Sequence, residues 1–262
     1  MITIERLRHN SRRVRQTLTT FDNGPALLRQ LASRDASDLE FRVDNLVVSC
    51  PNVAGARLAV YEVFAEDTYR LGSTLAGLGE SPRVLDFGAH IGCFTLGVLR
   101  VTPNAVVHTY ELSSATTRYL RRNITANDVG GAVTVWQEAV SDAAGVLRVV
   151  DNGEVSVHNG ILHAGDLPTI EVPTVPFATA LERLGGHADV VKMDIEGAEY
   201  AMVLKSDPGD WASVQRVVME YHALAGHGWA ELEEFFGDVG LRAVRRERTA
   251  PHLGLAWLTR DP

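Results

Sequence analysis

The sequence predicts an α/β fold: a mostly parallel, seven-stranded sheet with helices on both faces, preceded by an N-terminal cap. Three observations support this. Short runs rich in β-branched residues alternate with helical stretches from Ser81 onward. A glycine-containing turn joins the first of these runs to a helix, and the last two runs are close enough to pair as antiparallel neighbours. With 262 residues, 45% of them hydrophobic, the chain can bury one main core.

The cap is expected over residues 1–80 and the main domain over residues 81–262. Before Ser81 the chain mixes charged helical pattern with short strand-like pieces, and it carries no fingerprint of its own. Five arginines occur between residues 6 and 15, but no apolar segment follows them as in a secretory signal. We therefore assign them to the solvated face of a helix.

In the main domain, five strands are expected to run parallel because helical stretches separate them, at residues 83–87, 106–111, 133–138, 190–194 and 214–220. Two more, at residues 241–244 and 254–258, are expected to close the sheet as an antiparallel pair. Helices are expected from Gly92 onward and over residues 113–127, 178–184 and 229–239.

Composition narrows the choice of partners. A net charge of −8 argues against a duplex nucleic-acid binder, which needs a basic face to displace counterions. No apolar run reaches the roughly 18 residues that a membrane span requires. Cys50 and Cys93 lie far apart without metal-ligand spacing, and so predict two buried thiols in a reducing cytoplasm. A small molecule is the partner that fits this composition best, and the sequence is compatible with a homodimer.

The first candidate binding feature is the run Asp-Phe-Gly-Ala-His-Ile-Gly at residues 86–92, between a strand and a helix. In this setting Gly88 and Gly92 would let the backbone approach a nucleoside at the carboxyl end of the strand. The spacing differs from that of dinucleotide binders. Asp86 would repel a phosphate, but it suits an ammonium group or a water bound to one. A tight turn with a helix-capping acid is the structural alternative.

Glu111 follows the next strand, roughly 20 residues after this turn, where an acid can accept both ribose hydroxyls. A surface acid at a strand end is the alternative, and only the spacing argues against it. Neither Arg100 nor Arg118 is placed to read a 2′-phosphate, so NADP is disfavoured.

Residues 192–199, Lys-Met-Asp-Ile-Glu-Gly-Ala-Glu, complete a set of motifs that resembles the FkbM family of S-adenosylmethionine-dependent methyltransferases. The matching segments occur in the family's order over residues 61–222: the glycine turn, an acid after the second strand, Leu-x-x-Asn-x-x-x-Asn at 120–127, Ala-Val-Ser-Asp at 139–142, and Glu-Tyr-His at 220–222. This sequence departs from the family pattern at His90, usually Asn, at Leu112, usually Pro, and at residues 177–180, where Leu-Asp-Asp is common.

The resemblance implies a Rossmann-like class I methyltransferase with S-adenosyl-L-methionine as cofactor. The cofactor-binding residues that it implies are Asp86, Gly88, His90, Gly92, Glu111, Glu138, Ala139 and Asp142. Glu138, or the backbone at Ala139, would accept from the adenine amine at the third strand end. A solvent-facing Glu138 fits the sequence equally well.

The same resemblance places Asp194 and Glu196 near the transferable methyl group, and Glu220 and His222 at the end of the adjacent strand. His222 would accept the proton of the methyl acceptor, while Asp194 or Glu220 would orient the imidazole or the substrate. Glu199 fits better as a first-turn helix acid. A divalent ion could instead be held by the cluster of Asp194, Glu196, Glu220 and His222. We rank that below metal-free base catalysis, because the sequence has no compact ligand motif.

We therefore expect methyl transfer to a hydroxyl of a small molecule, a sugar or specialised metabolite. N-methylation of an amine or peptide and a non-catalytic nucleoside-binding module of a biosynthetic complex remain alternatives, with a nicotinamide oxidoreductase as the weakest rival. We expect residues 61–64 and Tyr69 to cover the cofactor, and residues 151–169 to select the acceptor. The alternative for the first segment is ordinary packing, and for the second an ordinary hairpin.

Overall fold

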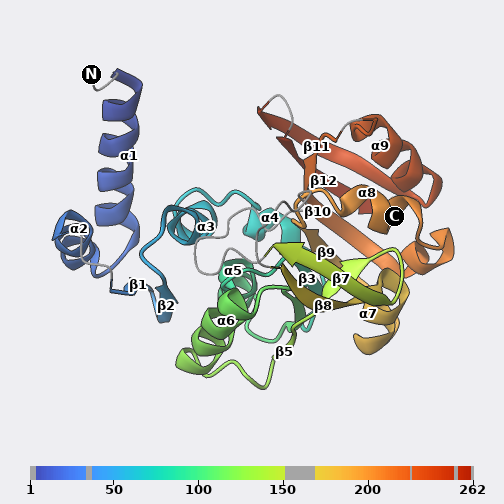
Figure 1. Cartoon of the computed structure of the whole chain (residues 1–262), viewed down its shortest axis with the longest axis horizontal. Helices are drawn as coiled ribbons and strands as arrows, with labels where there is room; N and C mark the ends of the chain where they lie inside the picture. The colour runs from blue at the N-terminus through green and yellow to red at the C-terminus, as the bar shows by residue number, and fades with distance from the viewer. Residues whose placement is uncertain (1–3, 34–36, 151–168, 225, 251–252, 261–262) are drawn as a thin grey trace.

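The computed structural model describes residues 4–33, 37–150, 169–224, 226–250 and 253–260. Within these ranges the chain forms one large sheet, two small sheets and the helices that cover them (Figure 1).

The large sheet has seven strands in the order β11-β12-β10-β9-β3-β4-β5. Five of them, from β10 to β5 across the sheet, are parallel, and β12 is antiparallel to both of its neighbours. This confirms the predicted sheet. The strands are β3 (Arg83–Phe87), β4 (Val106–Tyr110), β5 (Val133–Trp136), β9 (Ala188–Met193), β10 (Val214–His222), β11 (Leu241–Ala250) and β12 (Leu253–Arg260).

Alternate residues of the central strands pack into two separate hydrophobic clusters, one on each face of the sheet. Val84, Val190 and Val218 belong to the cluster formed with helices α3 (Ala54–Phe64), α4 (Leu71–Leu75), α5 (Cys93–Val101) and α6 (Ser114–Ala126). Their neighbours Leu85, Val191 and Val217 belong to the cluster formed with α7 (Phe177–Arg183), α8 (Glu199–Leu204), the 3-10 helix η2 (Pro208–Ser213) and α9 (Trp229–Asp238). Strands buried on both faces read as continuous apolar runs, which is the pattern of these segments.

The N-terminal part contains α1 (Ile4–Thr20), α2 (Gly24–Ser33) and the antiparallel strands β1 (Leu39–Val43) and β2 (Leu46–Cys50). In Figure 1, α1, α2 and β1 lie on the opposite side of the molecule from α9 and β11. Asn123 of α6 and Asn127, the residue that follows this helix, hold β2 in place. Asn123 bonds the backbone of Ser49 in both directions, and Asn127 does the same with Val47. These bonds give the Leu-x-x-Asn-x-x-x-Asn motif a structural role.

A three-stranded sheet was not predicted. It has the order β6-β8-β7 and consists of β6 (Ala139–Ser141), β7 (Gly145–Val150) and β8 (Thr169–Pro176). The strand expected over residues 133–138 therefore ends at Trp136, and the chain leaves the large sheet before it enters β6. The two closing strands are also longer than expected, because β11 and β12 pair along most of their length.

Both cysteines are buried free thiols, as the sequence predicts. Among the described residues, no helix has the length and apolar character needed to cross a membrane.

Candidate active site

A cavity lies where the parallel strands β3, β4 and β9 end. Its lining includes Gly88, His90, Glu111, Lys192 and Asp194, all within or just after these strands. The wall opposite them comes from α3, whose lining residues Gly55, Leu58, Ala59, Glu62 and Val63 fall on one helical face. In doubly wound sheets this edge is where ligands bind.

The glycine turn after β3 lies close to the end of β9, the adjacent strand in the sheet. Gly88 has a φ of +71°, and a Cβ atom added there would lie 1.8 Å from the carbonyl oxygen of Asp194, so only glycine fits. His90 also has a positive φ, 51°. Histidine and asparagine both occur in this region more often than most residues, so replacing the family's usual Asn preserves the turn. Burial lowers the pKa of His90 to about 4, which keeps its imidazole neutral.

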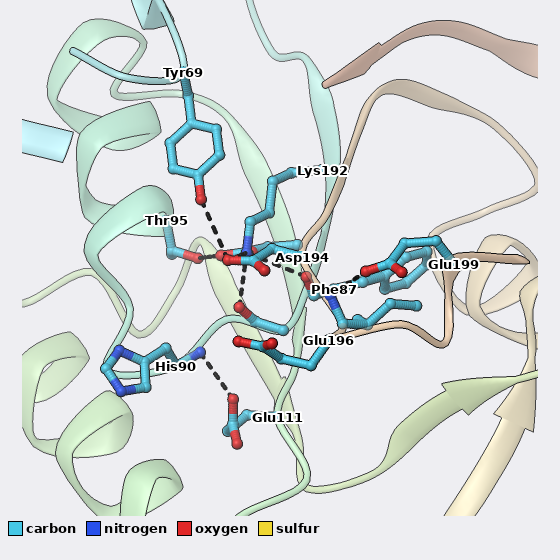
Figure 2. A network of polar contacts seen from close by, with 12 residues as sticks. Tyr69, Phe87, His90, Thr95, Glu111, Lys192, Asp194, Glu196 and Glu199 are labelled. Atoms are coloured by element: carbon cyan, nitrogen blue, oxygen red, sulfur yellow. Dashed lines mark hydrogen bonds and ion pairs between the residues drawn. The ribbon is translucent and has the colours of Figure 1, made fainter. Parts of the chain in front are cut away.

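Asp86 lies beneath the turn, fully buried and outside the lining of the cavity. It accepts a hydrogen bond from the Thr95 hydroxyl at 2.6 Å and pairs with the Lys192 ammonium at 3.4 Å. Figure 2 shows Lys192 at the centre of this network, where it also donates to the carbonyl oxygens of Phe87 and Gly88 at 3.2 and 2.7 Å. The pair therefore positions the turn. Gly92 is also outside the lining, since its Cα packs against Leu120.

Glu111 does line the cavity. Its two carboxylate oxygens accept from the backbone N–H groups of His90 at 2.9 Å (Figure 2) and of Ser113 at 2.8 Å. Each oxygen retains a lone pair that can accept a ligand hydroxyl. Burial raises the pKa of Glu111 to about 7, against the two backbone bonds, which lower it.

The structure separates the two remaining acids expected at the cofactor. Glu138 and Ala139 line the cavity, but both Glu138 oxygens already bond Arg183, whose guanidinium stacks 3.9 Å from the Trp136 ring centre. Asp142 lies outside the lining, and its carboxylate pairs with Lys205 at 2.8 Å. Ala139, Val140 and Ser141 also line the cavity, and their backbone groups are not engaged by such an ion pair.

His222, at the end of β10, is held between two carboxylates. Its Nδ1 lies 3.2 Å from Oε1 of Glu199 and its Nε2 lies 3.4 Å from Oε2 of Glu196. The orienting acids are thus Glu199 and Glu196, where the sequence suggested Asp194 or Glu220. Although burial disfavours the charged ring, the bond to Glu199 and the nearby acids raise the pKa of His222 to about 9. Glu199 is also a first-turn acid of α8 that accepts from the Ile195 N–H at 3.1 Å.

The carboxylates around Asp194 crowd one another. Burial, followed by the charge of Asp194, raises the pKa of Glu62 and of Glu196 to about 7 and that of Glu220 to about 8. Ligand atoms of Asp194, Glu220 and His222 lie within 4.8 Å of one another, close enough to share one divalent ion. The negative charge of these carboxylates would attract a bound cation.

Two of the lining residues from the N-terminal part carry polar groups, Glu62 and Tyr69, and the sequence marked them only as part of a segment expected to cover the cofactor. Glu62 projects from α3, and the Tyr69 hydroxyl donates to Oδ2 of Asp194 at 3.4 Å (Figure 2). Helical spacing is the signal that could have identified Glu62, because an acid shares a face with Gly55, Leu58 and Ala59 on an otherwise apolar helix. Of the segment expected to select the acceptor, residues 151–168 lie outside the described part of the chain.

The strand order, with β12 as its single antiparallel member, and a cavity at the carboxyl ends of the parallel strands define the Rossmann-like methyltransferase class of fold. Two solved structures from Pyrococcus horikoshii show the same fold. One is a transferase, at 13% identity and a TM-score of 0.50, covering 87% of this chain and 74% of that one. The other is TYW2 in complex with MeSAdo, at 12% identity and a TM-score of 0.50, covering 87% and 73%.

Sequence comparison identifies the family. Residues 86–243, more than half of the chain, match the methyltransferase FkbM domain. The chain is 26% identical to 31-O-demethyl-FK506 methyltransferase FkbM of Streptomyces tacrolimicus, over 76% of this chain and 92% of that protein. It is also 26% identical to methyltransferase sdnD of Sordaria araneosa, over 75% and 86%. The protein belongs to the FkbM methyltransferase family, and it is a methyltransferase.

Proposed function

We propose that the protein transfers a methyl group from S-adenosyl-L-methionine to a hydroxyl group of a small molecule. The observation that carries this proposal is one cavity lined both by Glu111, which offers two acceptor oxygens, and by Asp194 and Glu196, of which Glu196 lies 3.4 Å from Nε2 of His222, a residue just outside the lining. Glu111 can accept hydrogen bonds from the ribose hydroxyls, and Glu196 together with His222 can take part in proton transfer.

The residues present suit this cofactor. Glu111 would accept the ribose hydroxyls, and the backbone at Ala139 would meet the adenine, since the Glu138 side chain is engaged by Arg183. The crowded acids, whose raised pKa values reflect mutual repulsion and burial, would accommodate the positive charges of the methionine portion. When bound, the cofactor supplies a methyl group on a sulfonium, which is already a good leaving group.

The chain's own task is then to align the acceptor and to remove its proton. In the free protein His222 is protonated at neutral pH, so it cannot act as a base until it loses that proton. A cation bound among Asp194, Glu196 and Glu220 would disfavour the imidazolium and lower the pKa of His222. The neutral ring, still held by Glu199, would then accept the hydroxyl proton.

A hydroxyl acceptor is favoured by a relative. The protein of Streptomyces tacrolimicus is named for O-demethyl-FK506 methylation, and this chain covers 92% of it. A specialised metabolite is therefore our first choice of acceptor. Product analysis by mass-spectrometric fragmentation tests this: a methyl group found on nitrogen would replace the proposal with N-methylation.

Calorimetric titration with S-adenosylmethionine tests the cofactor. Glu111→Ala should weaken binding at least tenfold, because it removes the acceptor of both ribose hydroxyls. Asp86→Ala should also weaken binding, although indirectly, through release of Lys192 and the turn. The matched control is Glu233→Ala, an exposed acid on α9. Unchanged affinity in both site variants would remove the cofactor assignment.

Two further measurements separate the alternatives. Turnover that survives exhaustive chelation supports metal-free catalysis, whereas loss of turnover that Mg²⁺ or Mn²⁺ restores assigns Asp194, Glu220 and His222 as metal ligands. Cofactor binding without turnover on any hydroxyl or amine acceptor would favour a non-catalytic module.

A further inference from the structure

A second pocket of about 260 Å³ lies near the start of β10, away from the strand ends that form the active site. It is lined by the side chains of Arg70, Arg216 and Arg245 and by Trp257. Three arginines around one pocket are notable in a chain whose net charge is −8. They come from three separate places: the residue before α4, the strand β10, and the edge strand β11.

The positive charge of this pocket is only partly neutralised by the groups that contact it. Arg70 and Arg245 both bond the same oxygen, Oε1 of Glu247. Arg216 donates through Nη1 to the carbonyl oxygens of Ser73 and Thr74, which carry no formal charge. These four side chains therefore hold two positive charges in excess. Because both bonds of Arg216 use Nη1, its Nη2 and Nε remain for another partner.

Trp257 gives the pocket an apolar wall. The guanidinium groups of Arg70 and Arg245 lie 5.7 and 5.8 Å from its ring centre, and the ring is buried. These cation–π contacts and the shared bond to Glu247 keep both guanidinium groups beside the pocket. A guanidinium offers paired N–H donors that match the oxygens of a phosphate. An alternative explanation holds for Arg245 alone: a charged residue on the edge strand β11 would hinder pairing with a further strand. It does not explain Arg70 or Arg216, which lie outside that edge strand.

From this geometry we infer that the pocket between Arg70, Arg216 and Arg245 is a binding site for a small phosphate-bearing anion. The site borders the active-site wall. The Trp257 indole N–H donates to the carbonyl oxygen of Tyr69 at 3.2 Å, and the Tyr69 hydroxyl contacts Asp194 in the main cavity.

The indole N–H of Trp257 is a direct reporter for the test. The chain has four tryptophans, so a ¹⁵N-labelled sample gives few indole signals, and Trp257→Phe identifies the one of interest. Titration of the cofactor-free protein with inorganic phosphate, at constant ionic strength balanced with chloride, should shift this signal saturably. Glycerol phosphate distinguishes an ester from free phosphate, and acetate tests whether a carboxylate suffices.

Arg70→Gln combined with Arg245→Gln should weaken phosphate binding at least tenfold. The control is Arg15→Gln combined with Arg29→Gln, which removes two exposed arginines from α1 and α2 and changes the net charge equally. Arg70→Lys, which retains charge without the planar donors, should weaken binding several-fold. A shift that chloride reproduces, or one that persists in the double variant, overturns the inference. Because no cofactor is present, this result is independent of the proposed methyl transfer.

Discussion

His90 and His222 belong to the same site, yet their surroundings impose opposite protonation states. Burial lowers the pKa of His90 to about 4. At His222 burial acts in the same direction, but the bond to Glu199 and the nearby acids outweigh it and raise the pKa to about 9. His90 is therefore a neutral part of the turn. His222 carries a proton that it must lose before it can act as a base.

The pH dependence of catalysis should report this proton. We expect kcat/KM to rise with pH, to reach half of its maximum near pH 9 and to level off above it, because the free enzyme is active only with His222 deprotonated. His222→Ala should lower kcat by about 10²–10⁴-fold, remove this limb of the profile, and leave cofactor affinity nearly unchanged. His187→Ala, at a half-exposed histidine paired with Asp189, is the control. An alkaline limb that persists in His222→Ala would place the base elsewhere.

Gly88 allows a second prediction at the scale of one atom. A methyl group there would collide with the Asp194 carbonyl and would also force a left-handed backbone on alanine. Gly88→Ala should lower the free energy of unfolding by more than about 1 kcal/mol and weaken cofactor binding. Gly79→Ala is matched, because an added Cβ there has no neighbour within 4 Å. Chemical denaturation of both variants measures the difference; equal stabilities would contradict the close approach.

Among the elements, α6 connects the N-terminal part to the main domain. Asn123 is fully buried, accepts from the Ser49 N–H, and donates to the carbonyl oxygens of Ser49 and Ile91. Asn123→Ala leaves these groups without their partner, at a cost of about 1–3 kcal/mol for each one that stays unsatisfied. Thr125→Ala, exposed on the same helix, should have a much smaller effect. A loss no larger than that of the control would mean that the asparagine clamp does not stabilise the fold.

The sequence predicted the large sheet well because its signals are local. Apolar strand runs, separated by amphipathic helices, specify parallel strands and crossovers without knowledge of distant contacts. The three-stranded sheet escaped prediction because β6 is only Ala139–Ser141, and its pairing with β8 depends on a residue pair far apart in the sequence, such as Ala139 and Thr174. Strand β5 ends at Trp136 for the same reason, because the chain leaves the large sheet there to form β6 in the three-stranded sheet.

The residues of the candidate site could also be predicted from the sequence only in part. Glu111 was proposed from its spacing after the glycine turn, and Asp194 and His222 from the family resemblance. All three lie at one edge of the sheet because the parallel strands end there. The contacts that set their chemistry were not predicted. Glu199 reaches His222 from the start of α8, and Tyr69 reaches Asp194 from a segment before the domain. Such contacts depend on how elements pack, and spacing along the chain does not encode them.

At the scale of the whole molecule, the active site concentrates negative charge. Glu62, Glu196 and Glu220 all have raised pKa values, chiefly because they are buried and next because they lie near Asp194. Lys192 and His222 oppose them. The protein without ligand therefore carries an electrostatic cost at its centre, and a bound cation would relieve it.

This cost predicts how stability depends on pH. Between pH 6.5 and 9 the unfolded chain has released the protons of His222 and of these carboxyl groups, while the native state still holds part of them. The native state binds more protons, so the free energy of unfolding must fall as pH rises. The melting temperature of the free protein should decrease from pH 6.5 to pH 9. The decrease should shrink in Glu220→Gln, where one of the titrating groups is gone.

The control for this measurement is Glu233→Gln, at an exposed acid of α9, which should show the full decrease. Saturating cofactor should also flatten the curve, because its positive charges compensate the ionised carboxylates. A melting temperature that stays level or rises over this interval would contradict the pKa directions.

One wall of the cavity, with Glu62 and Tyr69, comes from the N-terminal 80 residues, while Glu111, Asp194 and Glu196 come from the remainder. The cavity is therefore complete only when both stretches of the chain are present. A chimera that joins the first 80 residues of one relative to the domain of another would pair the wall of the former with the acids of the latter, and its acceptor preference would measure how far that wall contributes to the choice of substrate.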